Sequence, residues 1–204
     1  MELTQRTQVK SLRWFVKMNS KTLAAIAVFT ALTVALNLSP FKFPAPYAPF
    51  LYYQIWEIPI VVAFLLFGPE TGTFVSVINT AALLVLFPGA LPTGPIYNLI
   101  ASLGMLAGIL GANWLMNRVS KGYKEVTLIV IATLFGVILR VIVMSFANWA
   151  FIRYPPPIGF SMPEEDIIAI LPLVAFFNAS LAMYTIPVGY VLARTISHSI
   201  KTNM

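Results

Sequence analysis

One arginine stands inside the most apolar stretch of the chain. Arg140 lies near the middle of residues 127–151, which are long enough to cross a bilayer as a helix at about 1.5 Å per residue. A guanidinium at that depth costs roughly 3 kcal/mol or more unless it is paired, so it should face protein or a wet cavity. Two interpretations stay open. Arg140 forms one wall of a solute pocket, or it is a structural charge bonded to a carboxylate or to backbone carbonyls between helices.

Other hydrogen-bonding and aromatic residues are expected at the same end of the molecule as this arginine. Asn148 follows Arg140 by two helical turns, about 80° around the helix, and the ring of Trp149 stands beside it. The candidate binding residues are Tyr53, Gln54, Glu57, Asn98, Arg140, Asn148, Trp149 and Asn178. Amides, one carboxylate and aromatic faces suit a flat, neutral, heteroaromatic solute. For the aromatic residues, the alternative is the belt of rings found at membrane interfaces.

Several classes of chemistry lack the residues that they need. The chain has no cysteine and one histidine, His198, which excludes disulfides, thiolate metal sites and a histidine metal cluster. It contains no Gly-x-x-x-x-Gly-Lys-[Ser/Thr], no His-Glu-x-x-His and no Gly-x-Ser-x-Gly. We therefore expect no catalytic residue, no metal site, no cofactor and no nucleotide bound by this chain.

The elements that position the candidate residues are expected to be membrane spans. Of the 204 residues, 59% are hydrophobic and only 10% are charged, against about 25% charged residues in soluble domains. The sequence predicts one all-α domain over 1–204 with six transmembrane helices, after a basic segment at 1–21. The spans are expected at about 22–38, 55–67, 71–87, 96–116, 127–151 and 166–194. Three proline-rich connections, at 39–53, 86–95 and 153–163, are expected to be stiff, non-helical loops.

The distribution of basic residues predicts the orientation in the bilayer. Ten of the thirteen Lys and Arg residues fall on one side of the predicted spans, Lys42 and Arg153 fall on the other, and Arg140 lies within the membrane. Because cytoplasmic flanks are enriched in Lys and Arg, we expect both termini in the cytoplasm and the three proline-rich loops outside. This topology explains the net charge of +6 better than a nucleic-acid partner does.

The first span carries small residues at a regular spacing. Ala27, Ala31 and Ala35 recur every four residues, and such a stripe is smooth enough for another helix to approach closely. The residues alone leave two interpretations open, contact with a partner protein or ordinary packing within the bundle.

Three stretches resemble one family of membrane proteins. The run EIPIVVAFLLFGPETG at 57–72 resembles the Asp-Ile-Pro … Gly-Pro … Gly run of the riboflavin-specific S components of energy-coupling factor (ECF) transporters. Arg140-x-x-x-Met144-x-x-x-Asn148 and Phe176-Phe177-Asn178 resemble the fifth and sixth spans of these subunits. Six spans, a small-residue stripe and a proline-rich first outer loop extend the resemblance over nearly the whole chain.

Two positions depart from the pattern of the riboflavin-specific subunits. The Asp of their motif is Glu57 here, and Leu181 and Ala182 stand where a lysine often follows the Asn of the sixth span.

The resemblance implies a transport protein of the prokaryotic cell membrane, not an enzyme. Such a subunit binds riboflavin or a related flavin from the outside and delivers it with a transmembrane coupling protein and two ATPase subunits. The resemblance assigns Ala27, Ala31 and Ala35 to docking of the coupling protein. Two alternatives remain, an S component for another vitamin or small solute, and a self-sufficient secondary carrier with Arg140 and Glu57 as its coupling pair. A membrane enzyme or scaffold is disfavoured, because the acidic site that such enzymes need is missing.

Overall fold

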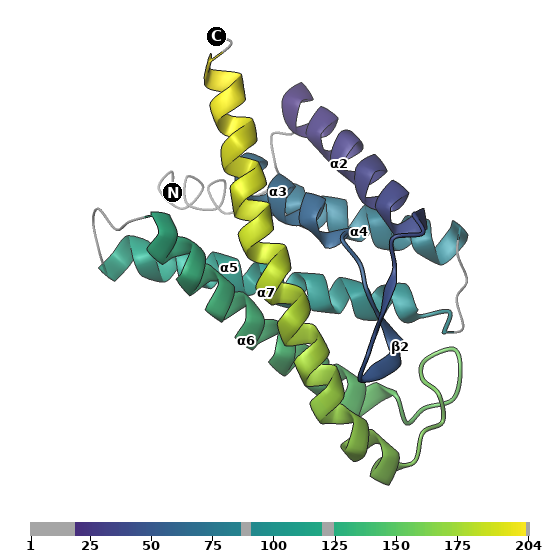
Figure 1. The fold of residues 1–204 in the computed structure, drawn as a ribbon. Helices are drawn as coiled ribbons and strands as arrows, with labels where there is room; N and C mark the ends of the chain where they lie inside the picture. The colour runs from purple at the N-terminus through teal and green to yellow at the C-terminus, as the bar shows by residue number, and fades with distance from the viewer. Residues whose placement is uncertain (1–18, 87–90, 120–124, 203–204) are drawn as a thin grey trace, which may run out of the picture.

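The computed structural model describes residues 19–86, 91–119 and 125–202 as a helical bundle with one short β-hairpin (Figure 1). The predicted basic segment 1–21 lies almost wholly outside the described residues. The described elements are α2 (Ser20–Leu38), β1 (Phe43–Ala45), β2 (Ala48–Tyr53), α3 (Glu57–Phe67), α4 (Pro69–Leu86), α5 (Gly94–Val119), α6 (Glu125–Phe151) and α7 (Glu164–Thr202). Five of these helices are long and apolar enough to cross a membrane, and α3, with 11 residues, is shorter. The predicted bundle of six helices is confirmed, with five of them long enough to be membrane spans, and the cytoplasmic position of both termini stays a prediction.

The helix boundaries follow local sequence signals. The side chain of Asn19 accepts a hydrogen bond from the backbone N–H of Thr22 at 2.8 Å and so caps the start of α2. Gly68 alone separates α3 from α4, and its φ of +98° lies in a region that L side chains rarely adopt. Pro69 then begins α4, where its fixed φ and missing N–H suit a first helical turn.

Close helix contacts build the core around α3, α5, α6 and α7. Helix α6 lies between α5 and α7, and α3 packs on α2, α4 and α7. At Gly108 the backbones of α5 and α6 nearly touch, since an added Cβ would stand 2.5 Å from the Cα of Gly136. The largest fully buried side chains include Ile60, Met105 and Ile186. This packing holds α3, although short, in the middle of the bundle.

The first proline-rich segment forms a β-hairpin, which the all-α prediction did not include. β1 and β2 run antiparallel, with Phe43 opposite Tyr53 and Ala45 opposite Ala48. The hydroxyl of Tyr53 is hydrogen-bonded to those of Tyr47 and Ser180, each at 2.6 Å, so the hairpin is fastened to α7. Burial and the hydrogen bond with Tyr53 raise the pKa of Tyr47.

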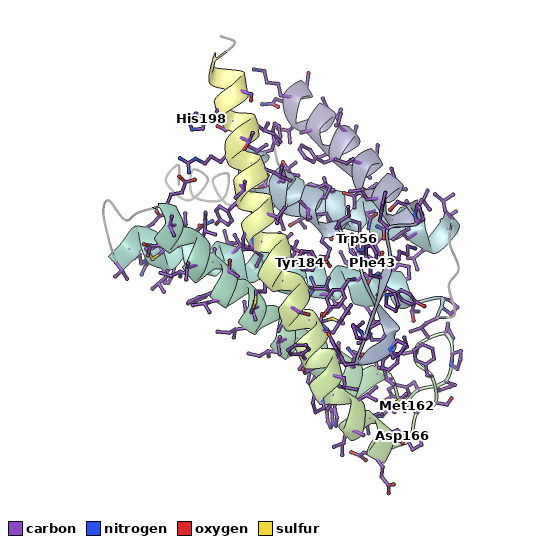
Figure 2. The ribbon with its side chains drawn as sticks, in the orientation of Figure 1. Phe43, Trp56, Met162, Asp166, Tyr184 and His198 are labelled. Atoms are coloured by element: carbon purple, nitrogen blue, oxygen red, sulfur yellow. The ribbon has the colours of Figure 1, made fainter. Side chains whose placement is uncertain are left out.

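The described residues give the bundle two different ends (Figure 1). We call the hairpin end the one that carries β1, β2 and the connection 152–163 between α6 and α7. At this end Tyr97 of α5 donates a hydrogen bond to the backbone oxygen of Ile158 at 3.0 Å. The opposite end carries the starts of α2 and α6 and the last turns of α7, and Figure 2 shows His198 there, far from Met162 and Asp166.

Candidate functional site

A cavity of about 290 Å³ lies at the hairpin end, between the hairpin and helices α3, α5, α6 and α7. Its volume is close to the lower limit of the roughly 300–1,000 Å³ typical of small-molecule pockets. The cavity is lined by Leu51, Tyr52, Gln54, Trp56, Glu57, Leu91, Gly94, Tyr97, Asn98, Ala101, Arg140, Met144, Asn148, Ile152, Phe160, Val174, Phe177, Asn178 and Leu181. Its walls are therefore mostly apolar, with a few polar groups.

An ion pair joins α6 to α3 in the wall of this cavity. Nη1 of Arg140 donates to Oε2 of Glu57 at 2.6 Å, and each side chain is only 3% exposed. Nε of Arg140 donates to Oδ1 of Asn178 at 3.0 Å, which adds α7 to the network. The two interpretations of Arg140 are therefore compatible, because the same side chain is bonded to a carboxylate and lines the cavity.

Two neighbouring residues add longer contacts to this pair. The hydroxyl of Ser102 donates to Oε1 of Glu57 at 3.4 Å, and Nη1 of Arg140 also approaches the sulfur of Met105 at 3.7 Å. Ser102 was not among the predicted residues. The signal for it was its position four residues after Asn98, on the same face of the predicted fourth span.

Arg140 and Asn148 are two of the polar groups of the cavity wall that are left available to a solute, beside the amides of Gln54 and Asn98. Arg140 uses Nε and Nη1 within the protein, and no acceptor for its Nη2 is found among the residues that the structure describes. Asn148 donates through Nδ2 to the backbone oxygen of Met144 at 2.7 Å. Its Oδ1 has no donor in the described part of the chain. The wall therefore offers N–H donors at Arg140 and an acceptor at Asn148.

Aromatic rings form the sides of the cavity below the hairpin. Tyr52, Trp56 and Phe177 contribute from β2, the start of α3 and α7, and Phe160 from the connection after α6. Figure 2 shows Trp56 in the middle of the molecule, close in view to the hairpin residue Phe43. Tyr184 of α7 donates a hydrogen bond to the backbone oxygen of Gln54. This bond fixes the chain between β2 and α3, where the cavity wall begins.

Six of the eight predicted binding residues line the cavity, namely Gln54, Glu57, Asn98, Arg140, Asn148 and Asn178. Tyr53 lies outside it, because its hydroxyl is bonded to Tyr47 and to Ser180 of α7, and its neighbour Tyr52 lines the cavity instead. Trp149 also lies outside it, since one residue turns a helix by 100° from Asn148. Trp149 is 42% exposed, and the guanidinium carbon of Arg153 lies over its ring, 5.0 Å from the ring centre.

The predicted docking stripe lies on the outer face of α2. Ala27, Ala31 and Ala35 are exposed, whereas Thr33 and Asn37 on the other face are buried. The amide of Asn37 donates to Oδ1 of Asn79 in α4 at 3.1 Å, so the buried face attaches α2 to the bundle. The alanine stripe is not used for packing within the described residues.

No group of three or more His, Cys, Asp or Glu side chains that could hold a metal ion occurs in residues 19–86, 91–119 and 125–202.

Comparison with solved structures places this fold among known ones. No protein-family model matches the chain, and no curated protein matches its sequence. A structure titled as the S component of a bacterial ECF transporter matches with a TM-score of 0.66 and 23% identity, over 89% of this chain and 98% of that one. The S component for biotin from an ECF-type ABC transporter matches with a TM-score of 0.51 and 20% identity, over 85% and 91%. The chain has the fold of these S components.

Proposed function

We propose that this chain is the substrate-binding S component of an ECF-type vitamin uptake transporter, and that its ligand is riboflavin or a related flavin. The observation that carries the proposal is the cavity at the hairpin end, where aromatic walls surround the polar groups of Arg140 and Asn148. The fold shared with two S components supports the class of protein.

The chemistry of riboflavin matches the cavity wall. Its isoalloxazine ring is flat and uncharged at neutral pH, and one edge alternates carbonyl acceptors with an N–H donor. Nη2 of Arg140 can donate to such a carbonyl, and Oδ1 of Asn148 can accept from such an N–H. Tyr52, Trp56 and Phe177 supply faces for stacking. The biotin-binding S component that shares the fold makes biotin the first alternative ligand to test.

The proposal also covers the membrane in which the chain lies and the proteins that it contacts. The five long apolar helices cross the cell membrane of a prokaryote, with the hairpin end outside and the termini in the cytoplasm, as the basic residues predict. The exposed stripe Ala27, Ala31 and Ala35 docks a transmembrane coupling protein, to which two ATPase subunits supply energy.

Equilibrium dialysis of the purified chain in lipid nanodiscs against riboflavin and against biotin tests the ligand. We expect retention of riboflavin, with the fluorescence of the bound flavin quenched by contact with Trp56 in the cavity wall. Trp56→Phe should brighten the bound flavin. Trp114→Phe is the matched control, because Trp114 is 56% exposed and packs against Arg118 away from the cavity. Retention of biotin alone would reassign the vitamin, and retention of neither would overturn the proposal.

Uptake by whole cells tests the docking surface. Ala31→Leu should abolish riboflavin uptake in cells that carry the coupling module, because the larger side chain roughens the stripe, while binding by the purified chain is unchanged. Ala107→Leu places the same substitution on the exposed face of α5 and should leave uptake normal. Normal uptake by the Ala31→Leu variant would refute the assignment.

The buried ion pair leaves one alternative function to be tested, that of a self-sufficient carrier. A self-sufficient carrier would need a coupling pair within the membrane, and Arg140 and Glu57 form such a pair. Proteoliposomes that contain this chain alone distinguish the two functions. Riboflavin accumulation driven by a proton gradient, without any ATPase, would favour the carrier.

A further inference from the structure

The cavity contains two formal charges that cancel each other. Among the lining residues that the structure describes, Arg140 and Glu57 are the only Arg, Lys, Asp, Glu or His side chains. They are 2.6 Å apart, and both are 97% buried, since 3% of each side chain is exposed. A solute in the cavity therefore meets a dipole with no net charge.

We infer that Glu57 determines the charge class of the substrate. By neutralising Arg140, Glu57 makes the cavity select an uncharged solute and reject an anionic one. This inference rests on the proposed function, because it describes the solute that the proposed binding site accepts. Glu57 acts here through Arg140, as a positioning and specificity-determining residue.

The contacts of Arg140 explain how one carboxylate has this effect. An anionic group entering the cavity loses its hydration, and an uncompensated cation could replace much of that loss. Nη1 is already directed at Glu57 and Nε at Asn178, so the solute reaches the guanidinium through Nη2. The carboxylate of Glu57 repels an anion at this position, whereas a neutral carbonyl still accepts the N–H bond.

The substitution Glu57→Gln separates the charge of Glu57 from its hydrogen bonds. A glutamine can accept from Nη1 of Arg140 as the carboxylate does, but it leaves the guanidinium without a counter-charge. In a buried site of low dielectric, one uncompensated charge changes the affinity for an anion by roughly tenfold or more. The variant should therefore gain affinity for anionic solutes relative to neutral ones.

The test compares riboflavin with two anionic flavins, riboflavin 5′-phosphate and 8-carboxyriboflavin, which carry their charge at opposite ends. The measured quantity is the dissociation constant of each anionic flavin divided by that of riboflavin, from equilibrium dialysis of the purified chain. Steric differences between the ligands cancel when this ratio is compared between variants. For Glu57→Gln we expect the ratio to fall by about tenfold or more for at least one anionic flavin.

Three further variants define the controls. Arg140→Gln leaves Glu57 as the unpaired charge and should move the ratio in the opposite direction, which tests the inference even if Glu57→Gln does not fold. The double variant Glu57→Gln/Arg140→Gln has a neutral cavity again and should return the ratio to that of the wild type. Glu164→Gln removes the same charge from an exposed pair with Arg153 at the hairpin end, at 3.9 Å, and should not alter the ratio.

The outcomes separate this inference from the proposed function. If the wild type binds riboflavin and neither single variant at the buried pair shifts the ratio, the role of Glu57 is wrong and the proposed function stands. If the wild type binds none of the three flavins, the proposed flavin site and the inference about its charge both fail.

Discussion

Two arginine–glutamate pairs connect helices at different levels of this bundle. Arg140 of α6 and Glu57 of α3 are 2.6 Å apart beside the cavity. Arg194 of α7 and Glu125 of α6 are 3.0 Å apart at the opposite end. The side chains of the first pair are 3% and 3% exposed, and those of the second are 60% and 45% exposed. The two contact distances are similar, but the exposure of the side chains differs greatly between the two pairs.

Burial changes what each pair needs from its neighbours. The buried pair has lost its hydration and is supported by Asn178, Ser102 and Met105. The exposed pair keeps water around both groups and is screened by salt. A buried ion pair often stabilises a fold no more than apolar side chains of similar volume would. Its position in the cavity wall therefore suggests that Arg140 and Glu57 serve the binding site more than the stability of the bundle.

The largest effect is expected from breaking the buried pair on one side. Arg140→Met leaves Glu57 buried without its cation and should lower the free energy of unfolding by about 3–5 kcal/mol. Reversible unfolding in mixed micelles measures this loss. The double variant Arg140→Met/Glu57→Met should recover most of it, because no buried charge remains. A double variant as unstable as the single one would show that the loss comes from packing and not from charge.

The positions of the helices were accessible from the sequence, and the pairing of their side chains was not. Hydrophobic runs predicted spans at 55–67 and 127–151, and the structure has α3 at Glu57–Phe67 and α6 at Glu125–Phe151. The cost of an isolated cation in the membrane predicted a buried partner or cavity for Arg140. Its partner is 83 residues away in the chain, and the rotation of α3 against α6 depends on packing that no local pattern specifies.

The directions of single side chains at the cavity also could not be predicted from the sequence. The proline content of residues 39–53 predicted a stiff, non-helical segment. Pairing of β2 with β1 and the bond of Tyr53 to Ser180 of α7 put Tyr52, and not Tyr53, in the cavity lining, and neither contact could be predicted from the sequence. On α6, the amphipathic pattern is weak because lipid and core are both apolar. To decide whether Asn148 or Trp149 faces the cavity, the position of α7 in the structure is therefore needed.

An intermediate effect is expected from an amide at the cavity. Asn148→Ala removes the available Oδ1 and should weaken riboflavin binding by about 1–3 kcal/mol, since a buried donor of the ligand loses its acceptor. Asn113→Ala is the matched control in α5, where Oδ1 of Asn113 accepts from the hydroxyl of Tyr190 at 3.4 Å, away from the cavity lining. Titration calorimetry in nanodiscs measures both. Equal losses for the two variants would mean that Asn148 acts on the fold and not on the ligand.

The smallest effect is expected at the exposed pair, and it completes the contrast with the buried one. Glu125→Gln removes the counter-charge of Arg194, whose side chain is 60% exposed, so water replaces the lost interaction. The free energy of unfolding should change by about 0–1 kcal/mol, and riboflavin binding should stay unchanged. At 1 M salt, where the Debye length is about 3 Å, even this difference should vanish. A loss as large as that of Arg140→Met, or one that persists in high salt, would show that contact distance and not burial governs these pairs.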